Sequence, residues 1–267
     1  MTPSLIFLKL GGSLITEKDK PATARLSVIH RLAEEISNSL KANPQMLLVL
    51  GHGSGSFGHV PAKKHNTRAG VKGDDQWAGF VEVWQQARAL NRIVMDALLE
   101  IGLRVISFPP SASIIAKNRQ IVSWDIATLQ AALGAGLLPV IYGDVAFDQE
   151  LGGTIFSTED LFAHLAQRMQ PKLILLAGDE EGIFEDYPQQ KRLIAEITPV
   201  KYSKLAKAIG EAVATDVTGG MAGKVQIMLK VVESLPNCEV RIFSGLKAGN
   251  VQKALSGIPV GTTLKTT

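Results

Sequence analysis

Two segments of the chain place lysine beside glycine in a way that suits the binding of an anion. The first, KLGGSLITEK, puts Lys9 at the end of an apolar run, continues with two glycines and a hydroxyl, and ends on Lys18. The last, DVTGGMAGK, has a glycine pair that opens a helix and carries Lys224 about one turn into it. Glycine lets backbone N–H groups approach an anion, a helix N-terminus attracts it, and lysine adds a compact positive charge. A phosphate group fits this combination, and we expect the three lysines to converge on one phosphate path.

The middle segment, GHGSGSFGH, adds a histidine to a glycine-rich turn. Gly53, Gly55 and Gly58 match the Gly-x-Gly-x-x-Gly fingerprint of dinucleotide sites, which makes an NAD-dependent oxidoreductase one alternative. That alternative leaves the lysines and His59 unexplained. An imidazole beside exposed N–H groups can hydrogen-bond a second anion without carrying a permanent charge. A site for two anions therefore uses all three segments.

Two acidic residues and a second histidine could organise these segments. Glu159 lies in STED, which is typical of a capping box at a helix start, and its carboxylate could orient the site lysines. Asp179 follows an apolar run and could receive a nucleotide hydroxyl or make an Asx turn. His52 is expected to fix the glycine loop. No Walker A sequence, zinc-type His/Cys cluster or Ser/His/Asp arrangement is evident, so no metal ligand among the protein side chains is predicted.

Short apolar runs that alternate with helical stretches must position these residues. The runs LIFLKL, MLLVL, LLPVIY and KLILLA lack polar alternation, as expected for strands covered by helices on both faces. The pattern predicts an α/β fold: a three-layer αβα sandwich with an open, mainly parallel central sheet. The predicted strands are 5–10, 46–50, 104–108, 138–142, 172–177 and 239–243, and the predicted helices are 27–41, 76–101, 124–133, 157–170 and 221–234. A weak lobe boundary is expected near 143–153, and any two lobes must share one sheet.

Composition narrows the class of protein. The chain has 267 residues, 46% hydrophobic and 20% charged, which excludes a disordered tail or a disulfide-stapled miniprotein. A net charge of +3 is too balanced to predict nucleic-acid binding, and no apolar run is long enough to span a membrane. The single cysteine, Cys238, excludes an intramolecular disulfide, and the first ten residues lack a leader pattern. We therefore expect a cytoplasmic protein.

Assembled, these motifs resemble the amino acid kinase superfamily and, within it, the isopentenyl phosphate kinase family. The resemblance covers nearly the whole chain and rests on KLGGSLITEK, GHGSGSFGHVPAKKH, YGD, STED, AGDEEGIFEDYP and DVTGGMAGK. It implies transfer of the γ-phosphoryl group of ATP to isopentenyl phosphate, giving isopentenyl diphosphate for isoprenoid biosynthesis, with Mg²⁺ and usually as a homodimer. It also implies one domain over 1–267, with an acceptor-binding lobe at about 1–150 and a nucleotide-binding lobe at about 151–267.

The resemblance also assigns roles to individual residues. The implied catalytic residues are Lys9, Lys18, His59 and Lys224. The implied ATP-binding residues are Lys9, Gly11, Gly12, Ser13, Gly55, Asp179, Gly220 and Lys224. The implied acceptor-binding residues are Ser54, Gly55, His59 and Thr158, and Glu159 is the carboxylate that organises the lysines. Two departures stand out: Ser54 replaces a glycine of the usual HGGGSFGH loop, and Thr158 and Glu159 replace Gly-Asp.

Three other functions remain open from the residues. A fosfomycin-type phosphonate kinase would share the histidine-bearing loop and need a more polar acceptor pocket. A non-catalytic nucleotide-sensing module would need only the ATP-binding residues and not His59. An NAD-dependent oxidoreductase would need only the Gly-x-Gly-x-x-Gly fingerprint. An apolar stripe with helical spacing is either plain core or a wall for an isoprenoid tail: Trp77, Phe80, Val83, Trp84 and Ala87.

Overall fold

An eight-stranded sheet runs through the centre of the molecule. The computed structural model describes residues 4–185, 190–203 and 220–266. Neighbouring strands follow in the order β10 (Glu196–Ile197), β12 (Thr262–Leu264), β11 (Glu239–Ser244), β9 (Leu173–Gly178), β1 (Leu5–Leu10), β2 (Leu47–His52), β6 (Leu138–Tyr142), β3 (Val105–Ser107). Every neighbouring pair is parallel except β11 and β12. The predicted open, mainly parallel sheet is confirmed.

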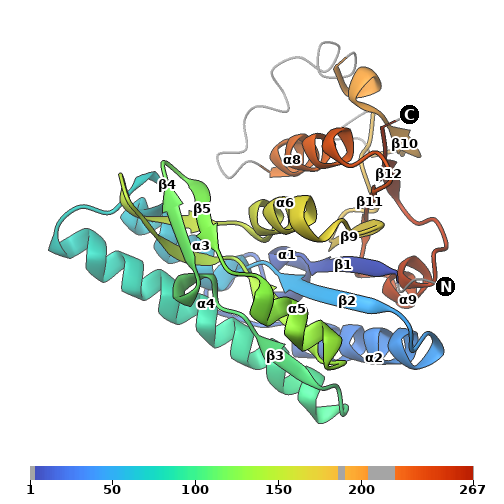
Figure 1. Cartoon of the computed structure of the whole chain (residues 1–267), viewed down its shortest axis with the longest axis horizontal. Helices are drawn as coiled ribbons and strands as arrows, with labels where there is room; N and C mark the ends of the chain where they lie inside the picture. The colour runs from blue at the N-terminus through green and yellow to red at the C-terminus, as the bar shows by residue number, and fades with distance from the viewer. Residues whose placement is uncertain (1–3, 186–189, 204–219, 267) are drawn as a thin grey trace.

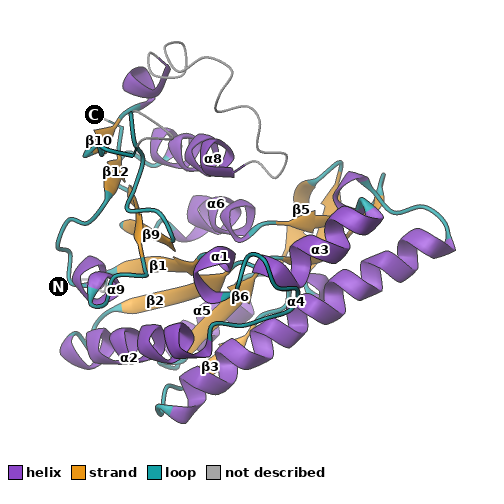
Figure 2. Ribbon diagram, turned by 180° about the vertical axis from the view of Figure 1, so that it is seen from behind, coloured by secondary structure: helices purple, strands orange, loops and turns teal. Residues whose placement is uncertain are grey.

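Helices cover both faces of this sheet, which gives the predicted three layers (Figures 1 and 2). One face packs against α1 (Gly12–Ile15), α2 (Leu26–Ala42), α4 (Asp74–Glu100) and α9 (Asn250–Leu255). The other packs against α5 (Ala127–Gly134), α6 (Thr158–Met169) and α8 (Gly220–Ser234). Because helices cover both faces, apolar side chains fill most positions of the central strands, as the sequence indicated, whereas Lys9 and His52 lie near the carboxyl ends of β1 and β2.

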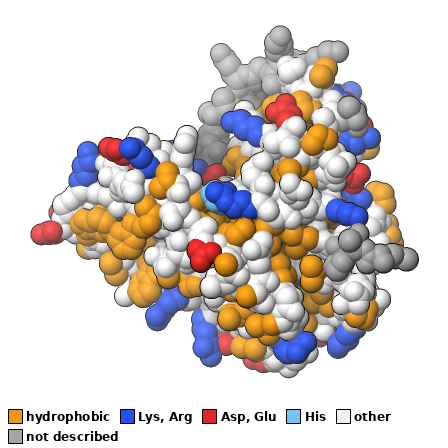
Figure 3. All heavy atoms as spheres, in the orientation of Figure 1, with side chains coloured by type: hydrophobic (Ala, Val, Ile, Leu, Met, Phe, Trp, Pro, Cys, Tyr) orange, Lys and Arg blue, Asp and Glu red, His pale blue; other side chains and the backbone are white. Residues whose placement is uncertain are grey.

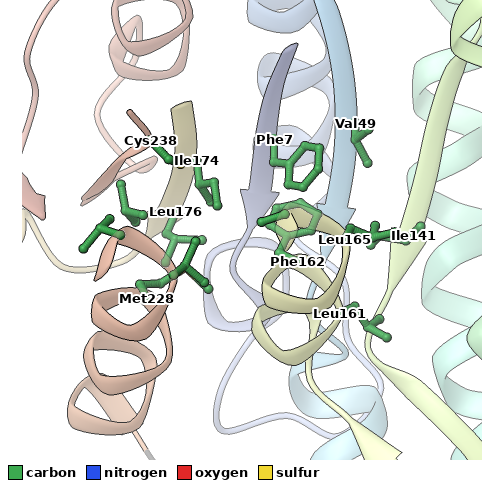
Figure 4. Packing of buried hydrophobic residues seen from close by; sticks show 14 of the residues in the cluster. Phe7, Val49, Ile141, Leu161, Phe162, Leu165, Ile174, Leu176, Met228 and Cys238 are labelled. Atoms are coloured by element: carbon green, nitrogen blue, oxygen red, sulfur yellow. The ribbon is translucent and has the colours of Figure 1, made fainter. Parts of the chain in front are cut away.

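The core between the sheet and α6 shows how tightly these layers pack. Phe7 of β1 lies against Phe162 of α6 with ring centroids 5.0 Å apart, and both side chains are fully buried. Figure 4 shows Val49, Ile141 and Leu165 beside this pair. The aromatic contact fixes the height of α6 over the sheet, and so fixes where the first turn of α6 meets the ends of the strands.

A second, four-stranded sheet was not predicted. It has the order β5 (Gln120–Trp124), β4 (Ile114–Lys117), β7 (Asp144–Asp148), β8 (Gly152–Phe156). Residues 143–153, whose composition suggested a lobe boundary, are mostly the β7–β8 hairpin. The predicted helix 124–133 is wrong at its start, because Trp124 ends a strand and the helix begins at Ala127.

The glycine loop after β2 continues as a helix, α3 (Gly55–His65), followed by short 3₁₀ turns at Thr67–Ala69 and, later, Pro110–Ala112. Two glycines and Pro61 disfavour a helix in this sequence, so packing must supply the stability. Phe57 is buried, and a side chain at Gly79 of α4 would clash with His65 of α3. The close approach of α3 and α4 therefore depends on the absence of a Cβ at Gly79.

Strands from the two halves of the chain belong to one sheet. β1 pairs with β2 on one side and with β9 on the other, so the first strand joins both halves. Among the described residues, no helix is long and apolar enough to cross a membrane.

Candidate functional site

The glycine segments meet because β1 is flanked by β2 and β9. All three strands run parallel, so their carboxyl ends lie along one edge of the sheet. Gly53 N–H donates to the carbonyl of Leu10 at 3.0 Å, and Gly11 N–H donates to the carbonyl of Ala177 at 2.7 Å. The segments that follow β1, β2 and β9 are therefore hydrogen-bonded neighbours.

Two of these segments make backbone-to-backbone contact. A Cβ on Gly12, the first residue of α1, would clash with the backbone nitrogen of Gly55, the first residue of α3. Gly55 also has φ of +48°, which a residue with a side chain adopts only with strain. Only glycine at both positions lets the starts of α1 and α3 lie this close.

Ser54 fits the position where related loops have glycine. Its backbone angles, φ −81° and ψ −15°, are ordinary for an α-helical residue, so the serine introduces no backbone strain. Its hydroxyl donates to the carbonyl of Gly143 at 3.2 Å. This bond ties the glycine loop to the turn between β6 and β7.

A buried ion pair forms the centre of the site. Lys9 Nζ lies 3.0 Å from Glu159 Oε1, and the two side chains are only 7% and 5% exposed. Ser157 and Asp160 form the predicted capping box that starts α6 and holds Glu159 in its first turn. Burial alone would raise the pKa of Glu159, but the ammonium groups of Lys9 and Lys224 lower it below its ordinary value. Glu159 is therefore ionised and balances two lysines.

The structure also brings Lys18 and Lys224 to this region. Lys18 Nζ lies 3.0 Å from Asp179 Oδ2 at the end of β9, with the lysine side chain 60% exposed. Burial lowers the pKa of Lys224, and the charge of Lys9 lowers it further, with a smaller contribution from Lys18. The carboxylates of Glu159 and Asp179 oppose this shift. Three lysines and two carboxylates thus act on one another, which leaves an excess of positive charge for an anion.

His59 of α3 lies close enough to the same lysines for their charges to act on its ring. The residue is exposed, but partial desolvation lowers the pKa of this imidazole, and the positive charges of Lys9 and then Lys224 lower it further. The ring is therefore neutral at pH 7 and can donate one hydrogen bond.

His52 shapes the glycine loop, as the sequence suggested. Its ring is fully buried, stacks on Tyr142 at a centroid distance of 5.4 Å, and places Nδ1 3.1 Å from the carbonyl of Gly53. Its Nε2 lies 3.1 Å from the side-chain amide of Asn91 on α4. Burial lowers the pKa of His52, and its two ring nitrogens face the oxygens of Gly53 and Asn91, either of which can accept the single N–H of the neutral ring.

Thr158 at the start of α6 is hydrogen-bonded to the glycine loop that follows β2. Its side chain is 1% exposed, and its hydroxyl donates to the carbonyl of His52 at 2.6 Å. The hydroxyl is thereby committed to the protein backbone, which places Thr158 under the glycine loop rather than open at the site surface.

Some predicted segments lie outside the described residues. Residues 204–219, which include the start of DVTGGMAGK, are among them, whereas Gly220 opens α8 and Lys224 is in its second turn. Sequence reasoning missed Asn91 and Thr16. Asn91 gave a readable signal, a polar residue on the buried face of α4, but Thr16 gave none because its partner is 40 residues away.

Comparison with known proteins agrees with this geometry. The model of the amino acid kinase family matches residues 4–244, most of the chain. The chain belongs to the amino acid kinase family. Two relatives within it are isopentenyl phosphate kinases of Methanocaldococcus jannaschii and Methanothermobacter thermautotrophicus, each 33% identical over 97% of this chain and 98% of its own length. A crystal structure of isopentenyl phosphate kinase superposes with a TM-score of 0.82 at 30% identity, covering 98% of this chain and all of that one.

Membership of the amino acid kinase family fits the site observed. The family consists of phosphotransferases, and the cation cluster lies where two glycine segments meet at the ligand edge of the sheet. The GSGSFGH segment, which carries the resemblance most specifically, forms the start of α3 and positions His59 in this cluster.

Proposed function

We propose that this chain is an ATP-dependent kinase that phosphorylates isopentenyl phosphate to isopentenyl diphosphate. The observation that carries the proposal is the backbone contact of Gly12 and Gly55, at the edge of the sheet where the charges of Lys9 and Lys224 also act on His59. Two glycine-rich anion cradles share one set of cations, which suits a reaction between two polyanions. The isopentenyl phosphate kinases that match nearly the whole chain support the same substrate.

The roles of the residues follow from where they lie. We assign the phosphates of ATP to the first glycine segment and to α8, and the acceptor phosphate to the start of α3. The ATP-binding set is Lys9, Gly11, Gly12, Ser13, Gly55, Asp179, Gly220 and Lys224. The acceptor set is Ser54, Gly55 and His59, with Thr158 beneath the loop. The segments up to about residue 150 would thus carry most acceptor contacts, and those from about 151 most nucleotide contacts.

The transfer needs positioning more than acid–base chemistry. An oxygen of the acceptor phosphate, already ionised near neutral pH, attacks the γ-phosphorus of ATP while the bond to the β–γ bridging oxygen breaks and ADP leaves. Negative charge spreads over the γ-phosphoryl oxygens and the departing ADP. Lys9, Lys18 and Lys224 would stabilise that charge, and neutral His59 would hold the acceptor by a hydrogen bond.

Mg²⁺ would enter this site with the nucleotide. Among the described residues no group of three or more His, Cys, Asp or Glu side chains could hold a metal ion, and Glu159 and Asp179 are each paired with a lysine. We propose that the phosphates of ATP hold most of the ion's ligand positions, where it neutralises phosphate charge.

An apolar cluster beside α3 favours an isoprenoid acceptor over a phosphonate drug. Val71, Phe80, Val83 and Val145 form a buried cluster, against which Ala62 of α3 packs, three residues after His59. Side chains of this kind suit a branched hydrocarbon tail, whereas fosfomycin would need more polar partners. The stripe on α4 that the sequence left open between core and tail wall includes Phe80 and Val83.

We also propose a homodimer as the working assembly. Exposed hydrophobic side chains gather over α4 and the smaller sheet, as Figure 3 shows on one face. Val81, Ile115, Val122 and Phe147 are each more than a third exposed, and Val81 and Phe147 border an apolar groove of about 350 Å³. A second copy covering this surface would remove it from water.

An acceptor panel tests the proposed function. ADP release would be measured with isopentenyl phosphate, dimethylallyl phosphate, fosfomycin and uridylate, each at the same concentration with ATP and Mg²⁺. We expect the highest kcat/KM with isopentenyl phosphate. Preference for fosfomycin would support the phosphonate kinase, and ADP release with none of the four would contradict the assigned chemistry.

A further inference from the structure

Thr16 joins the two glycine segments, although neither its type nor its position marked it in the sequence. Its side chain is fully buried directly after α1. The hydroxyl donates to the carbonyl of Gly12 at 2.8 Å and accepts from the backbone N–H of Ser56 at 3.0 Å. Gly12 belongs to the segment assigned to ATP phosphates, and Ser56 to the segment assigned to the acceptor phosphate.

The bond to Ser56 replaces a helix cap that α3 lacks. Ser54 occupies the N-cap position of α3 but makes no capping hydrogen bond: its backbone angles are α-helical rather than extended, and its hydroxyl donates to the carbonyl of Gly143. Ser56 is the second residue of the helix, where the backbone N–H has no partner within the helix. Thr16 supplies the missing acceptor from an element 40 residues earlier in the chain.

The same residue lies at the base of the loop that carries Lys18. Lys18 follows Thr16 by two residues, and Thr16 forms a bridge with Ala24 that closes this loop. Ala22 N–H, in the same loop, lies 3.5 Å from the carbonyl of Ser56. Both polar groups of the Ser56 backbone therefore face the Lys18 loop and its base.

We propose that Thr16 is a positioning residue for phosphoryl transfer: its hydroxyl sets the distance between the ATP-phosphate segment and the acceptor-phosphate segment. The proposal rests on the proposed function. In-line transfer depends on the separation of the attacking oxygen and the γ-phosphorus, and a misplacement of about 1 Å can cost on the order of 100-fold in rate. Each segment keeps its own contacts to its own substrate, so loss of the hydroxyl should lower kcat far more than it weakens either binding step.

The test compares Thr16→Val with a matched control in the same chain. Thr262 is also fully buried, and its hydroxyl donates to the carbonyl of Ile194 at 2.6 Å and accepts from the N–H of Ile183 at 2.8 Å. It lies on β12, three strands away from β1 in the sheet. Thr262→Val removes an equivalent bridging hydroxyl, so it reports the loss of stability that the substitution causes by itself.

Steady-state kinetics with isopentenyl phosphate and ATP would be measured for both variants, with kcat normalised to ATP-binding sites titrated by calorimetry. We expect Thr16→Val to lower kcat on the order of 10- to 100-fold, with each KM within about threefold of the unaltered protein. Thr262→Val should leave kcat within about twofold of the unaltered protein. It should lower Tm by about as much as Thr16→Val does. Thr16→Ser, which keeps the hydroxyl, should restore kcat to within about threefold.

Other outcomes would overturn the inference. If Thr16→Val and Thr262→Val retain equal kcat, the Thr16 hydroxyl has only a structural role. A rise in either KM with unchanged kcat would show a contact to one substrate rather than control of the distance between two. Should Thr16→Val not fold, Thr16→Ala removes the same hydroxyl without a new methyl group and takes its place. An unaltered protein that does not phosphorylate isopentenyl phosphate would instead refute the proposed function, and the inference with it.

Discussion

Replacing Glu159 by glutamine removes the charge of a carboxylate that balances two lysines without changing the size of the side chain. Lys9 and Glu159 are 3.0 Å apart and less than a tenth exposed, so solvent screens their attraction poorly. Removing one partner of a buried pair costs about 3–5 kcal/mol, because the other charge is left uncompensated. At about 2–4 °C per kcal/mol, Tm should fall by roughly 6–20 °C. We also expect kcat to fall by about tenfold or more, since Lys9 loses the group that orients it.

The chain offers a matched control for this substitution. Glu196 pairs with Lys265 at 2.9 Å, but the two side chains are 47% and 36% exposed. Breaking such an exposed pair costs about 0–1 kcal/mol. Thermal unfolding and steady-state kinetics of Glu159→Gln and Glu196→Gln would be compared side by side. Equal effects of the two variants on Tm and kcat would refute the reasoning, because they would show that Lys9 does not depend on Glu159.

pH adds a second test of the same pair. Because the pKa of Glu159 is lowered in the folded protein, its ionisation stabilises the fold above the unfolded pKa, about 4.3. That contribution is lost as pH falls from there through the folded pKa. The free energy of unfolding, measured with urea between pH 7 and pH 3, should therefore depend less on pH in Glu159→Gln than in the unaltered protein.

Three further predictions follow from the site and its surroundings. His59→Ala should raise KM for isopentenyl phosphate while ATP affinity by calorimetry stays near that of the unaltered protein, and His59→Gln should retain partial activity as a hydrogen-bond donor; an equal loss for both ligands would show that His59 only shapes the loop. Lys224→Ala should lower kcat by about 100-fold or more with little change in Tm, whereas a fall in Tm with normal kcat in the folded fraction would make this lysine structural. His164 stacks on Trp124, and burial lowers its pKa to about 4, so the unfolded chain binds a proton from pH 6.5 downward while the folded one does not. Stability should fall by about 1–2 kcal/mol from pH 7 to pH 4.5, discounted for partial exposure, and His164→Gln should remove that part of the slope in urea unfolding.

The sequence predicted the central sheet well because its strands are buried on both faces. Runs such as LIFLKL, short, apolar and without polar alternation, are typical of strands covered by helices on both faces. The sequence did not predict the smaller sheet, because β4 and β5 are only four and five residues long and join through a turn at Asn118 and Arg119. Its turn is held by Asp148, which accepts N–H groups from both turn residues, a contact between distant segments that no local pattern indicates.

The parts of the site that depend on local sequence could be predicted, whereas contacts between residues far apart in the chain could not. STED marked a helix start, and this placed Glu159 in a first turn where it could meet the lysines. That it meets Lys9 in particular depends on β1 lying between β2 and β9, which is a property of the sheet order. The hydroxyls of Thr16 and Thr158 act on backbone groups far along the chain, so their roles required the structure.

The most direct measurement of the central claim follows the γ-phosphoryl group itself. The protein would be incubated with isopentenyl phosphate, Mg²⁺ and ATP labelled with ¹⁸O in its γ-phosphoryl group, and the products identified by mass spectrometry. We predict isopentenyl diphosphate that carries the label in its terminal phosphoryl group, together with unlabelled ADP. Label found only in inorganic phosphate, or only in unreacted ATP, would contradict phosphoryl transfer between the two glycine segments.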